Sequence, residues 1–506
     1  MWRSVMADKR QSTSFIGHTA TYAVGNIARW LVGFAMLPVY TRLLSPAEYG
    51  VIGLLTFALA FFEPLFGARL IHAVPKFYFD AAEGLERRAV IWTAVAVTGV
   101  VSLASMTALI LFRRVGAELL FGDNLYSLAL GVFAVNLVTQ PLENAGMMFL
   151  RLRSRSRLFL GASMGKLVLQ IALNLFLVVY LRVGVLGVVL SSVISSTVIG
   201  IALLIYTATQ ESPQFDWAMA RRMINYCWPL WLSGLAGLYI GSSSAMYLRV
   251  LRSLSDVGLL ELGLRFATAL TLLVWTPFSQ HWQPMSFQYY KEKDGKWRFQ
   301  IAFAVSAFVM FAAGLGISIF SQPVIQLMAA KTFAPAAVLV PILTLGFVVN
   351  NLVSFFNFSF MVTAQTKVAS LCQYAIGLVI TVAYVVLIPR FGIVGAAWGQ
   401  CIAFLFGFFL IWRLSRRYFD PGFDLKPVAL FTAIGVITYA GANLLFPGRT
   451  IAVDLLVKSF FYLIAVGVMM VITLRSVKAS HADALNSLPW PLHRLGRITQ
   501  GRTPRL

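Results

Sequence analysis

Ionisable side chains occur inside long apolar segments of this chain, where a charge is costly. They are Arg29, Glu63, Glu143, Lys166, Glu261, Arg265, Asp454 and Lys458. A charged side chain at the centre of a bilayer costs about 2.5–3.5 kcal/mol on insertion scales, so such residues usually face a polar cavity or an opposite charge. An arginine guanidinium can bind two phosphate oxygens at once. Arginines at this depth therefore indicate a phosphate-bearing ligand that enters the membrane.

The segment around Arg29, TYAVGNIARWLVGFAMLPVY (residues 21–40), has one helical face of polar and small side chains. Spacings of three or four residues put on that face His18, Tyr22, Gly25 and Arg29, with Asn26 beside them. No acidic residue of this segment lies one turn away from Arg29. Two interpretations stay open: Arg29 lines a cavity, or it forms a structural ion pair with Glu63 on the next helix.

Other charges in these segments also allow both a functional and a structural interpretation. Glu63 directly precedes Pro64, which predicts a kinked helix that is either static or bends during transport. Arg69, near the end of that helix, lines the cavity or extends to the membrane interface. Lys166 is a weaker cavity candidate, and we expect it to be able to pair with Glu143 on the neighbouring helix.

Two pairs of opposite charges have the i, i+4 spacing that favours an ion pair on a helix. For Asp454 and Lys458 this spacing favours a structural pair. Glu261 and Arg265 show the same spacing, but the second of them is also a candidate for substrate contact, and both interpretations stay open.

Membrane-spanning helices are the elements that must position these residues. The chain has 506 residues, of which 59% are hydrophobic and only 12% charged, and its mean hydropathy is +0.79. Apolar runs of about 20 residues, the length that spans a bilayer, recur with short breaks marked by Pro, Gly and Arg. They predict an all-α polytopic membrane protein with about 14 transmembrane helices. The predicted spans are 14–40, 48–70, 88–112, 125–148, 157–181, 184–207, 224–248, 257–280, 298–320, 334–360, 367–388, 392–412, 427–446 and 451–474.

Lysine and arginine are distributed unevenly between the predicted loops. With the N-terminus in the cytoplasm, the cytoplasmic side holds about three times as many as the opposite side, which predicts that both termini are cytoplasmic. This bias accounts for the net charge of +22, and nucleic acid is not an expected partner.

Motifs of enzymes and metal sites are absent from the sequence. The cysteines Cys227, Cys372 and Cys401 show no metal-ligand spacing, and no Walker A sequence or catalytic membrane motif occurs. We expect no enzymatic activity, no metal and no cofactor. Proton or sodium coupling through Glu63 or Glu143 stays open.

The sequence repeats itself at an offset of 208 residues. LLSPAEYGVIGL (43–54) aligns with LRSLSDVGLLEL (251–262), and RVGVLG (182–187) aligns with RFGIVG (390–395). Each repeat holds six predicted helices, an even number, so the two copies form parallel lobes around a central cavity. The predicted domains are an N-lobe at 1–210, a C-lobe at 211–418, helices 13 and 14 at 419–474 and a basic cytoplasmic tail at 475–506.

The chain also resembles a known family of transporters. LPVYTRLLSPAEYGVIGLLTFALAFFEPLFGARLIHAVPKFYF (37–79) resembles the opening of the polysaccharide transporter family, which are flippases for lipid-linked oligosaccharides such as O-antigen units. RVGVLGVVLSSVISS and RFGIVGAAWGQCIA resemble span starts of the same family. That family belongs to the multidrug/oligosaccharidyl-lipid/polysaccharide exporter (MOP) superfamily. The resemblance implies that Arg29, Arg69 and Arg265 line the cavity, and Glu261 beside the last of these departs from the pattern.

This resemblance further implies a flippase in the bacterial inner membrane. It would pass undecaprenyl-diphosphate-linked oligosaccharide units to the outer leaflet by alternating access, for the biosynthesis of O-antigen, capsule or exopolysaccharide. The expected partners are the polyprenyl-diphosphate-linked oligosaccharide and membrane lipids, with the polymerase and the chain-length regulator of the same pathway as candidates. A lipid II flippase and, with less support, a cation-coupled multidrug exporter stay open as alternatives.

Overall fold

The described part of the chain is helical. The computed structural model describes residues 33–65, 70–81, 84–292, 295–444 and 451–480, and no β-strand occurs in these ranges. Within them, nine helical segments are long and apolar enough to cross a membrane, and a shorter apolar helix covers Pro46–Leu59. The predicted class, an all-α polytopic membrane protein, is confirmed. The number of 14 spans stays a prediction, because most of the first predicted span lies outside the described residues.

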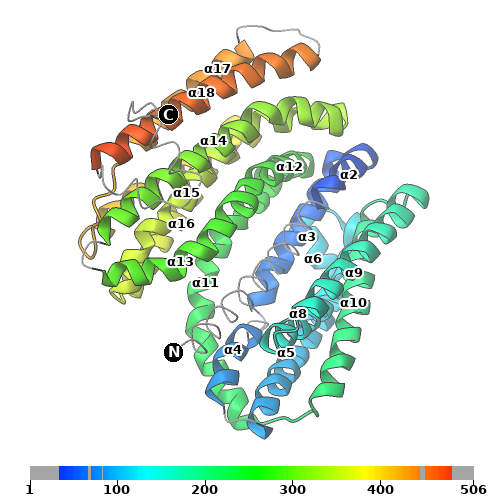
Figure 1. The fold of residues 1–506 in the computed structure, drawn as a ribbon. Coiled ribbons are helices and arrows are strands. Elements are labelled where there is room, and N and C mark those ends of the chain that lie inside the picture. The colour runs from blue at the N-terminus through cyan, green and yellow to red at the C-terminus, as the bar shows by residue number, and fades with distance from the viewer. Residues whose placement is uncertain (1–32, 66–69, 82–83, 293–294, 445–450, 481–506) are drawn as a thin grey trace, which may run out of the picture. The chain divides into compact units, whose positions relative to one another are not determined.

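Two compact units make up the chain (Figure 1). Unit 1 comprises Met1–Glu261, Met328–Phe333 and Ile388–Ala396, and unit 2 comprises Leu262–Leu327, Ala334–Leu387 and Ala397–Leu506. The lobe boundary predicted between residues 210 and 211 falls inside unit 1 and stays a prediction.

Unit 1 contains the helices from α2 to α11 and the first half of α12. Their bounds are α2 Leu37–Leu43, α3 Pro46–Leu65, α4 Leu70–Asp80, α5 Leu85–Leu111, α6 Arg113–Phe121, α7 Ser127–Phe133, α8 Asn136–Leu152, α9 Ser156–Asn174, α10 Val185–Gln210, α11 Trp217–Leu251 and α12 Leu254–Leu270. A 3₁₀ turn, η1 (Asn124–Tyr126), precedes α7, and a π-helical segment, η2 (Leu175–Tyr180), extends α9. The helices α4, α5, α8 and α11 share a core of buried residues that includes Val74, Ile91, Phe149 and Met223.

A buried carboxylate fastens one end of unit 1. Glu211, which follows α10 and is 6% exposed, forms ion pairs with Arg88 of α5 and with Arg153, the residue after α8. The backbone carbonyl of Glu211 accepts a hydrogen bond from the Trp92 indole at 3.0 Å. Three helices are thereby joined at the segment that leads into α11.

Unit 2 contains the second half of α12 and most of the helical structure that follows it, apart from the two segments assigned to unit 1. The elements after α12 are η3 Thr271–Trp275, α13 Thr276–Lys291, α14 Lys296–Met328, η4 Lys331–Val338, α15 Leu339–Val362, α16 Thr366–Ser415, α17 Lys426–Leu444 and α18 Ile451–Ser480. The span predicted at 257–280 is longer in the structure, because helical structure continues through Pro277 and Pro284 to Lys291. The helix α18 likewise continues to Ser480, six residues beyond the predicted end of the last span.

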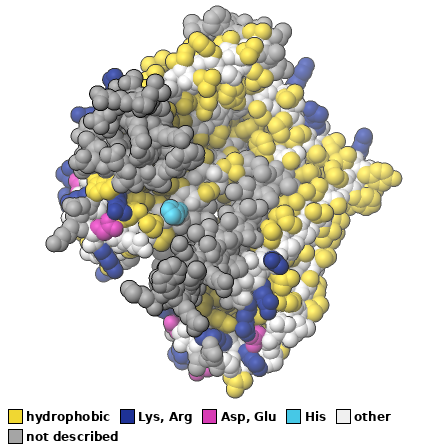
Figure 2. Space-filling model, in the orientation of Figure 1, with side chains coloured by type: hydrophobic (Ala, Val, Ile, Leu, Met, Phe, Trp, Pro, Cys, Tyr) yellow, Lys and Arg dark blue, Asp and Glu magenta, His cyan; other side chains and the backbone are white. Residues whose placement is uncertain are grey.

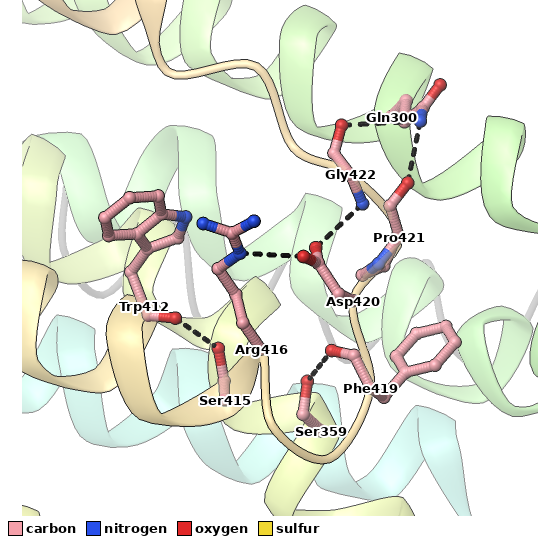
Figure 3. Close-up of polar contacts among 9 residues, drawn as sticks. All are labelled: Gln300, Ser359, Trp412, Ser415, Arg416, Phe419, Asp420, Pro421 and Gly422. Carbon is pink, nitrogen blue, oxygen red and sulfur yellow. Dashed lines mark hydrogen bonds and ion pairs between the residues drawn. The ribbon is translucent and has the colours of Figure 1, made fainter.

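The loop between α16 and α17 is held by side chains of unit 2 (Figure 3). The Asp420 carboxylate accepts hydrogen bonds from Arg416 Nε at 2.7 Å and from the Gly422 amide at 2.9 Å. Gln300 of α14 donates to the Pro421 carbonyl at 2.7 Å, and Ser359 of α15 donates to the carbonyl of Phe419 at 2.9 Å. These bonds fix the path of the chain into α17, which lies side by side with α18 (Figure 1).

Apolar side chains cover much of the described surface. On the face drawn in Figure 2, hydrophobic side chains form broad areas in which Lys and Arg are scattered. The helix α18 carries an exposed stripe at helical spacing that consists of Val453, Leu456, Phe460, Leu463, Ile464, Val468 and Val471. A stripe of this kind is stable only against lipid or another apolar surface.

Local geometry repeats at the same offset of 208 residues as the sequence. The Ser45 hydroxyl accepts a hydrogen bond from the Glu48 backbone amide at 3.2 Å, and the Ser253 hydroxyl accepts one from the Asp256 backbone amide at 3.1 Å. The helices α3 and α12 therefore begin with equivalent N-terminal caps. Gly184 has φ 64° and ψ −138°, and Gly392 has φ 57° and ψ −131°. At Gly392 this conformation divides α16 into two helical segments, at the place where the sequence predicts the start of a new span.

We predict that Gly184→Ala and Gly392→Ala destabilise the protein to a similar extent, by about 1–3 kcal/mol each, because a residue with a Cβ is strained in this backbone region. The measurement is the apparent melting temperature of purified protein in detergent. Gly99→Ala and Gly467→Ala are the controls, since no atom lies within 4 Å of a Cβ at either position. A normal melting temperature for either test variant would contradict the prediction.

Candidate functional site

The structure describes only part of the residues that the sequence predicts to line the substrate path. His18, Tyr22, Asn26, Arg29 and Arg69 lie outside the described residues. The backbone of Glu63 belongs to α3, but its side chain is outside the description. Glu261 and Arg265 are on α12 and Lys166 is on α9, and all three side chains are described. The cavity-lining role therefore stays a prediction for the whole set.

Lys166 forms an ion pair inside unit 1. Its Nζ lies 2.5 Å from Glu143 Oε2 of α8, and the side chains are 18% and 5% exposed. The pairing expected from the sequence is confirmed. Two opposite charges that desolvate together inside a membrane helix bundle cost far less than either alone.

A stripe of buried polar side chains continues from this ion pair along α8. Asn136, Thr139, Glu143 and Gly146 have helical spacing and lie on one face, with Asn136 fully buried and Thr139 only 6% exposed. The amide atoms of Asn136 and the hydroxyl of Thr139 have no hydrogen-bond partner among the described residues. Sequence analysis missed this stripe because on this helix it considered only the ionisable Glu143, although the spacing of three, four and three residues was available.

The helix α10 covers this stripe and adds another hydroxyl. A Cβ at Gly200 would lie 3.3 Å from the Thr139 carbonyl oxygen and 3.4 Å from the Glu143 nitrogen, and Leu203 lies against Gly146. The two helices therefore run in the same direction at this contact, and Ser196 lies beside the turn that contains Asn136. Ser196 is fully buried, and its hydroxyl also lacks a partner in the described part of the chain. Such groups are usually satisfied by ordered water.

The half-buried side chain of Glu261, on α12, packs against α3 at Gly53. A Cβ at Gly53 would overlap the Cγ of Glu261 and would lie 3.1 Å from its Oε1. Arg265, one turn further along α12, is also half-buried. The glutamate side chain thus occupies space that only a glycine on α3 leaves open.

Asp454 and Lys458 of α18 form the expected i, i+4 ion pair in unit 2. The Lys458 Nζ lies 2.8 Å from Asp454 Oδ2 and 3.3 Å from Gln322 Oε1 of α14, and Lys458 is only 1% exposed. The buried Lys458 ammonium therefore has polar partners on two helices. This supports the structural interpretation of the pair, which joins α18 to α14.

An apolar groove of about 260 Å³ lies within unit 2 among the five helices from α14 to α18. Its lining includes Phe311, Leu345, Trp398, Phe431, Gly435 and Met469. Two hydroxyl groups of the lining are satisfied inside their own helices, since Ser318 donates to the Gly314 carbonyl and Thr432 to the Val428 carbonyl. The groove consequently presents hydrocarbon to any occupant. Sequence analysis did not predict it, because its shape depends on the tertiary packing of five helices.

The described residues contain no group of three or more His, Cys, Asp or Glu side chains that could hold a metal ion. Unit 1 contains the Lys166–Glu143 pair and the polar stripe of α8, and unit 2 contains the Asp454–Lys458 pair and the apolar groove.

Comparison with known proteins identifies a family by sequence. A sequence profile described as "Polysaccharide biosynthesis protein" matches residues 39–338. No curated protein matches the chain by sequence.

Similar solved structures are transporters and a flippase. The lipid II flippase MurJ in an inward closed conformation has a TM-score of 0.71 and 14% identity, over 90% of this chain and 98% of that chain. An inward-facing multidrug resistance MATE family transporter of the MOP superfamily has a TM-score of 0.61 and 13% identity, over 78% and 97%. The MATE multidrug transporter DinF-BH has a TM-score of 0.57 and 16% identity, over 80% and 95%. The predicted fold of the MOP superfamily is confirmed.

Removal of one partner of the Lys166–Glu143 pair should destabilise the protein more than removal of both charges. Lys166→Met leaves a buried carboxylate without its cation, which costs about 3–5 kcal/mol, whereas Lys166→Met with Glu143→Gln avoids that cost. Apparent melting temperatures in detergent measure the difference. Arg416→Met, which removes an ion pair whose side chains are 49% and 29% exposed, is the control and should cost less than about 1 kcal/mol. Equal effects of Lys166→Met and Arg416→Met would contradict the prediction.

Proposed function

Because the chain belongs to the polysaccharide biosynthesis protein family, we propose that it is a flippase for undecaprenyl-diphosphate-linked oligosaccharide units. It moves these units across the bacterial inner membrane by alternating access, for the biosynthesis of O-antigen, capsule or exopolysaccharide. The observation that carries the proposal is the family match over residues 39–338 in a chain with the fold of a lipid-linked flippase. The same observations support a transporter rather than an enzyme.

The substrate explains why intramembrane arginines are useful. A diphosphate and a sugar chain cannot cross hydrocarbon without hydrogen-bonding partners. Arginine forks bind phosphate oxygens in pairs, and Arg29, Arg69 and Arg265 are the residues that we propose for this contact. Outward movement of a diphosphate across a membrane whose inside is negative releases about 2.3 kcal/mol per charge per 100 mV, so the membrane potential favours export.

The apolar groove in unit 2 is suited to the other end of the substrate. Its lining is almost entirely hydrocarbon. The Ser318 and Thr432 hydroxyls donate their hydrogen bonds to backbone carbonyls of their own helices. A polyprenyl chain can occupy such a groove because nearly all of the exposed lining is hydrocarbon. We therefore assign part of the polyprenyl tail to the groove.

Lipid II is the second candidate substrate. The observation that favours it is the similarity to the lipid II flippase MurJ, whose TM-score of 0.71 exceeds those of the MATE transporters reported above. Both substrates share a polyprenyl diphosphate, so the arginine contacts and the groove serve either. A cation-coupled multidrug exporter is a weaker alternative, because it needs no polyprenyl groove.

The remaining assignments follow from the same proposal. Both termini are cytoplasmic, and the polymerase and the chain-length regulator of the pathway are the proposed protein partners. Proton or sodium coupling would act through Glu63 or Glu143.

Replacement of Arg29 tests the headgroup contact. Arg29→Ala should lower the rate at which fluorescent undecaprenyl-diphosphate trisaccharide is flipped in liposomes by about tenfold or more, the loss of one charge-assisted contact. Arg29→Lys should restore only part of the rate, because lysine keeps the charge and loses the fork. The exposed Arg114 provides the control variant Arg114→Ala, which should flip at the wild-type rate. A wild-type rate for Arg29→Ala would refute the contact.

Filling of the apolar groove tests the tail assignment. No atom lies within 4 Å of a Cβ at Gly435, so Gly435→Leu fits and fills part of the groove. We expect transport of an undecaprenyl substrate to fall about tenfold, as the loss of about two buried methylene groups predicts, while a substrate with a short geranyl tail is unaffected. Gly467→Leu, on α18 outside the groove, is the control. An equal loss for both tail lengths would argue against the assignment.

A further inference from the structure

The N-terminal halves of α3 and α12 meet through residues that are equivalent under the offset of 208. A Cβ at Gly50 would clash with the carbonyl oxygen of Leu254, and a Cβ at Gly258 would clash with that of Pro46. Each would also lie close to the amide nitrogen of the opposite glycine, at 2.9 Å and 3.0 Å. Pro46 and Leu254 are themselves 208 residues apart. The contact is therefore two-fold symmetric, with backbone directly against backbone.

One turn further along, two equivalent positions again face each other, but their residue types differ. Gly53 and Glu261 are again 208 residues apart, and they face each other. A Cβ at Gly53 would overlap the Glu261 Cγ and would lie 2.8 Å from its Cδ. The Glu261 side chain thus packs directly against the backbone of α3, because the equivalent residue of the first repeat is glycine and has no side chain.

The carboxylate of Glu261 lies within a membrane helix. It is seven residues beyond Leu254, the start of α12, which corresponds to about 10 Å along the helix axis. An ionisable group at such depth is costly and is a functional candidate by default. The backbone contact at Gly50 and Gly258 prevents the helices from moving closer together, so the space above Gly53 determines where the carboxylate lies.

We propose that Gly53 and Glu261 form a matched pair between α3 and α12, at positions that are equivalent under the offset of 208. The space that Gly53 leaves open holds the Glu261 side chain and fixes the place of its carboxylate, and this contact is called the seat. Glu261 is then a positioning residue. It sets the crossing of the two helices and the orientation of the α12 face that carries Arg265 one turn later. This role in transport rests on the proposed flippase function, whereas the seat itself does not.

The symmetry makes a specific demand on the pair. Because positions 53 and 261 are equivalent, the carboxylate can be supplied from either helix, provided that the opposite position is glycine. The swapped variant Gly53→Glu with Glu261→Gly should therefore rebuild the contact. Gly53→Glu alone places two carboxylates at one point, and Glu261→Gly alone leaves none.

A double-mutant cycle tests the seat through the apparent melting temperature in detergent. Each single variant should melt several degrees below wild type, and the swapped variant should return to within about 2 °C, because contacting residues are not additive. Gly99→Glu with Glu261→Gly is the matched control. It keeps the net charge but puts the carboxylate at an open position on α5, and it should show no recovery. A swapped variant that melts as low as the worse single variant would overturn the proposal.

Flipping of fluorescent undecaprenyl-diphosphate trisaccharide in liposomes tests the positioning role. Both single variants should flip about tenfold more slowly than wild type or worse, since displaced groups lose orientation, and the swapped variant should recover to within about threefold. Glu261→Gln keeps the shape of the side chain and should both melt and flip like wild type, because the space above Gly53 stays filled. Slow flipping of Glu261→Gln at a normal melting temperature would overturn the positioning role. If wild-type protein moves no polyprenyl-linked sugar, the proposed function fails, and the melting cycle still decides whether the seat exists.

Discussion

An ionic group inside hydrocarbon must find an opposite charge or water, and this constraint organises the described structure. Glu143 meets Lys166 across two helices, and Lys458 meets both Asp454 and Gln322. The first pair joins α8 to α9, and the bond from Lys458 to Gln322 joins α18 to α14, in a setting where the hydrophobic effect contributes little between helices. For the arginines that we propose to contact the substrate, the diphosphate is an additional opposite charge.

The second constraint is the close approach of backbones at equivalent glycines. Gly184 and Gly392 adopt the same unusual conformation at the starts of two spans, and Gly50 and Gly258 allow α3 and α12 to touch. These features recur at the same offset of 208 residues as the sequence matches, as the predicted duplication would require. Divergence between the copies is then most informative where geometry is equal and chemistry is not, as at Gly53 and Glu261.

Much of the fold could be predicted from the sequence because spans and ion pairs are local or periodic patterns. Hydropathy located most helices within a few residues, and the i, i+4 spacing identified the Asp454–Lys458 pair. What could not be predicted depends on tertiary contacts. Helical structure continues through Pro277 and Pro284, the groove needs five helices, and the buried stripe with Asn136 is made of uncharged residues. The residues around Arg29 lie outside the described part of the chain, so their role is still a prediction.

The central claim is that this protein carries a polyprenyl-linked oligosaccharide from the inner to the outer leaflet. The most direct measurement is the accessibility of a labelled lipid-linked sugar to an impermeant reagent added outside intact cells, before and after depletion of the protein. The account predicts that depletion abolishes outer accessibility while the labelled lipid accumulates in the inner leaflet. Unchanged outer accessibility, with synthesis of the lipid intact, would contradict it.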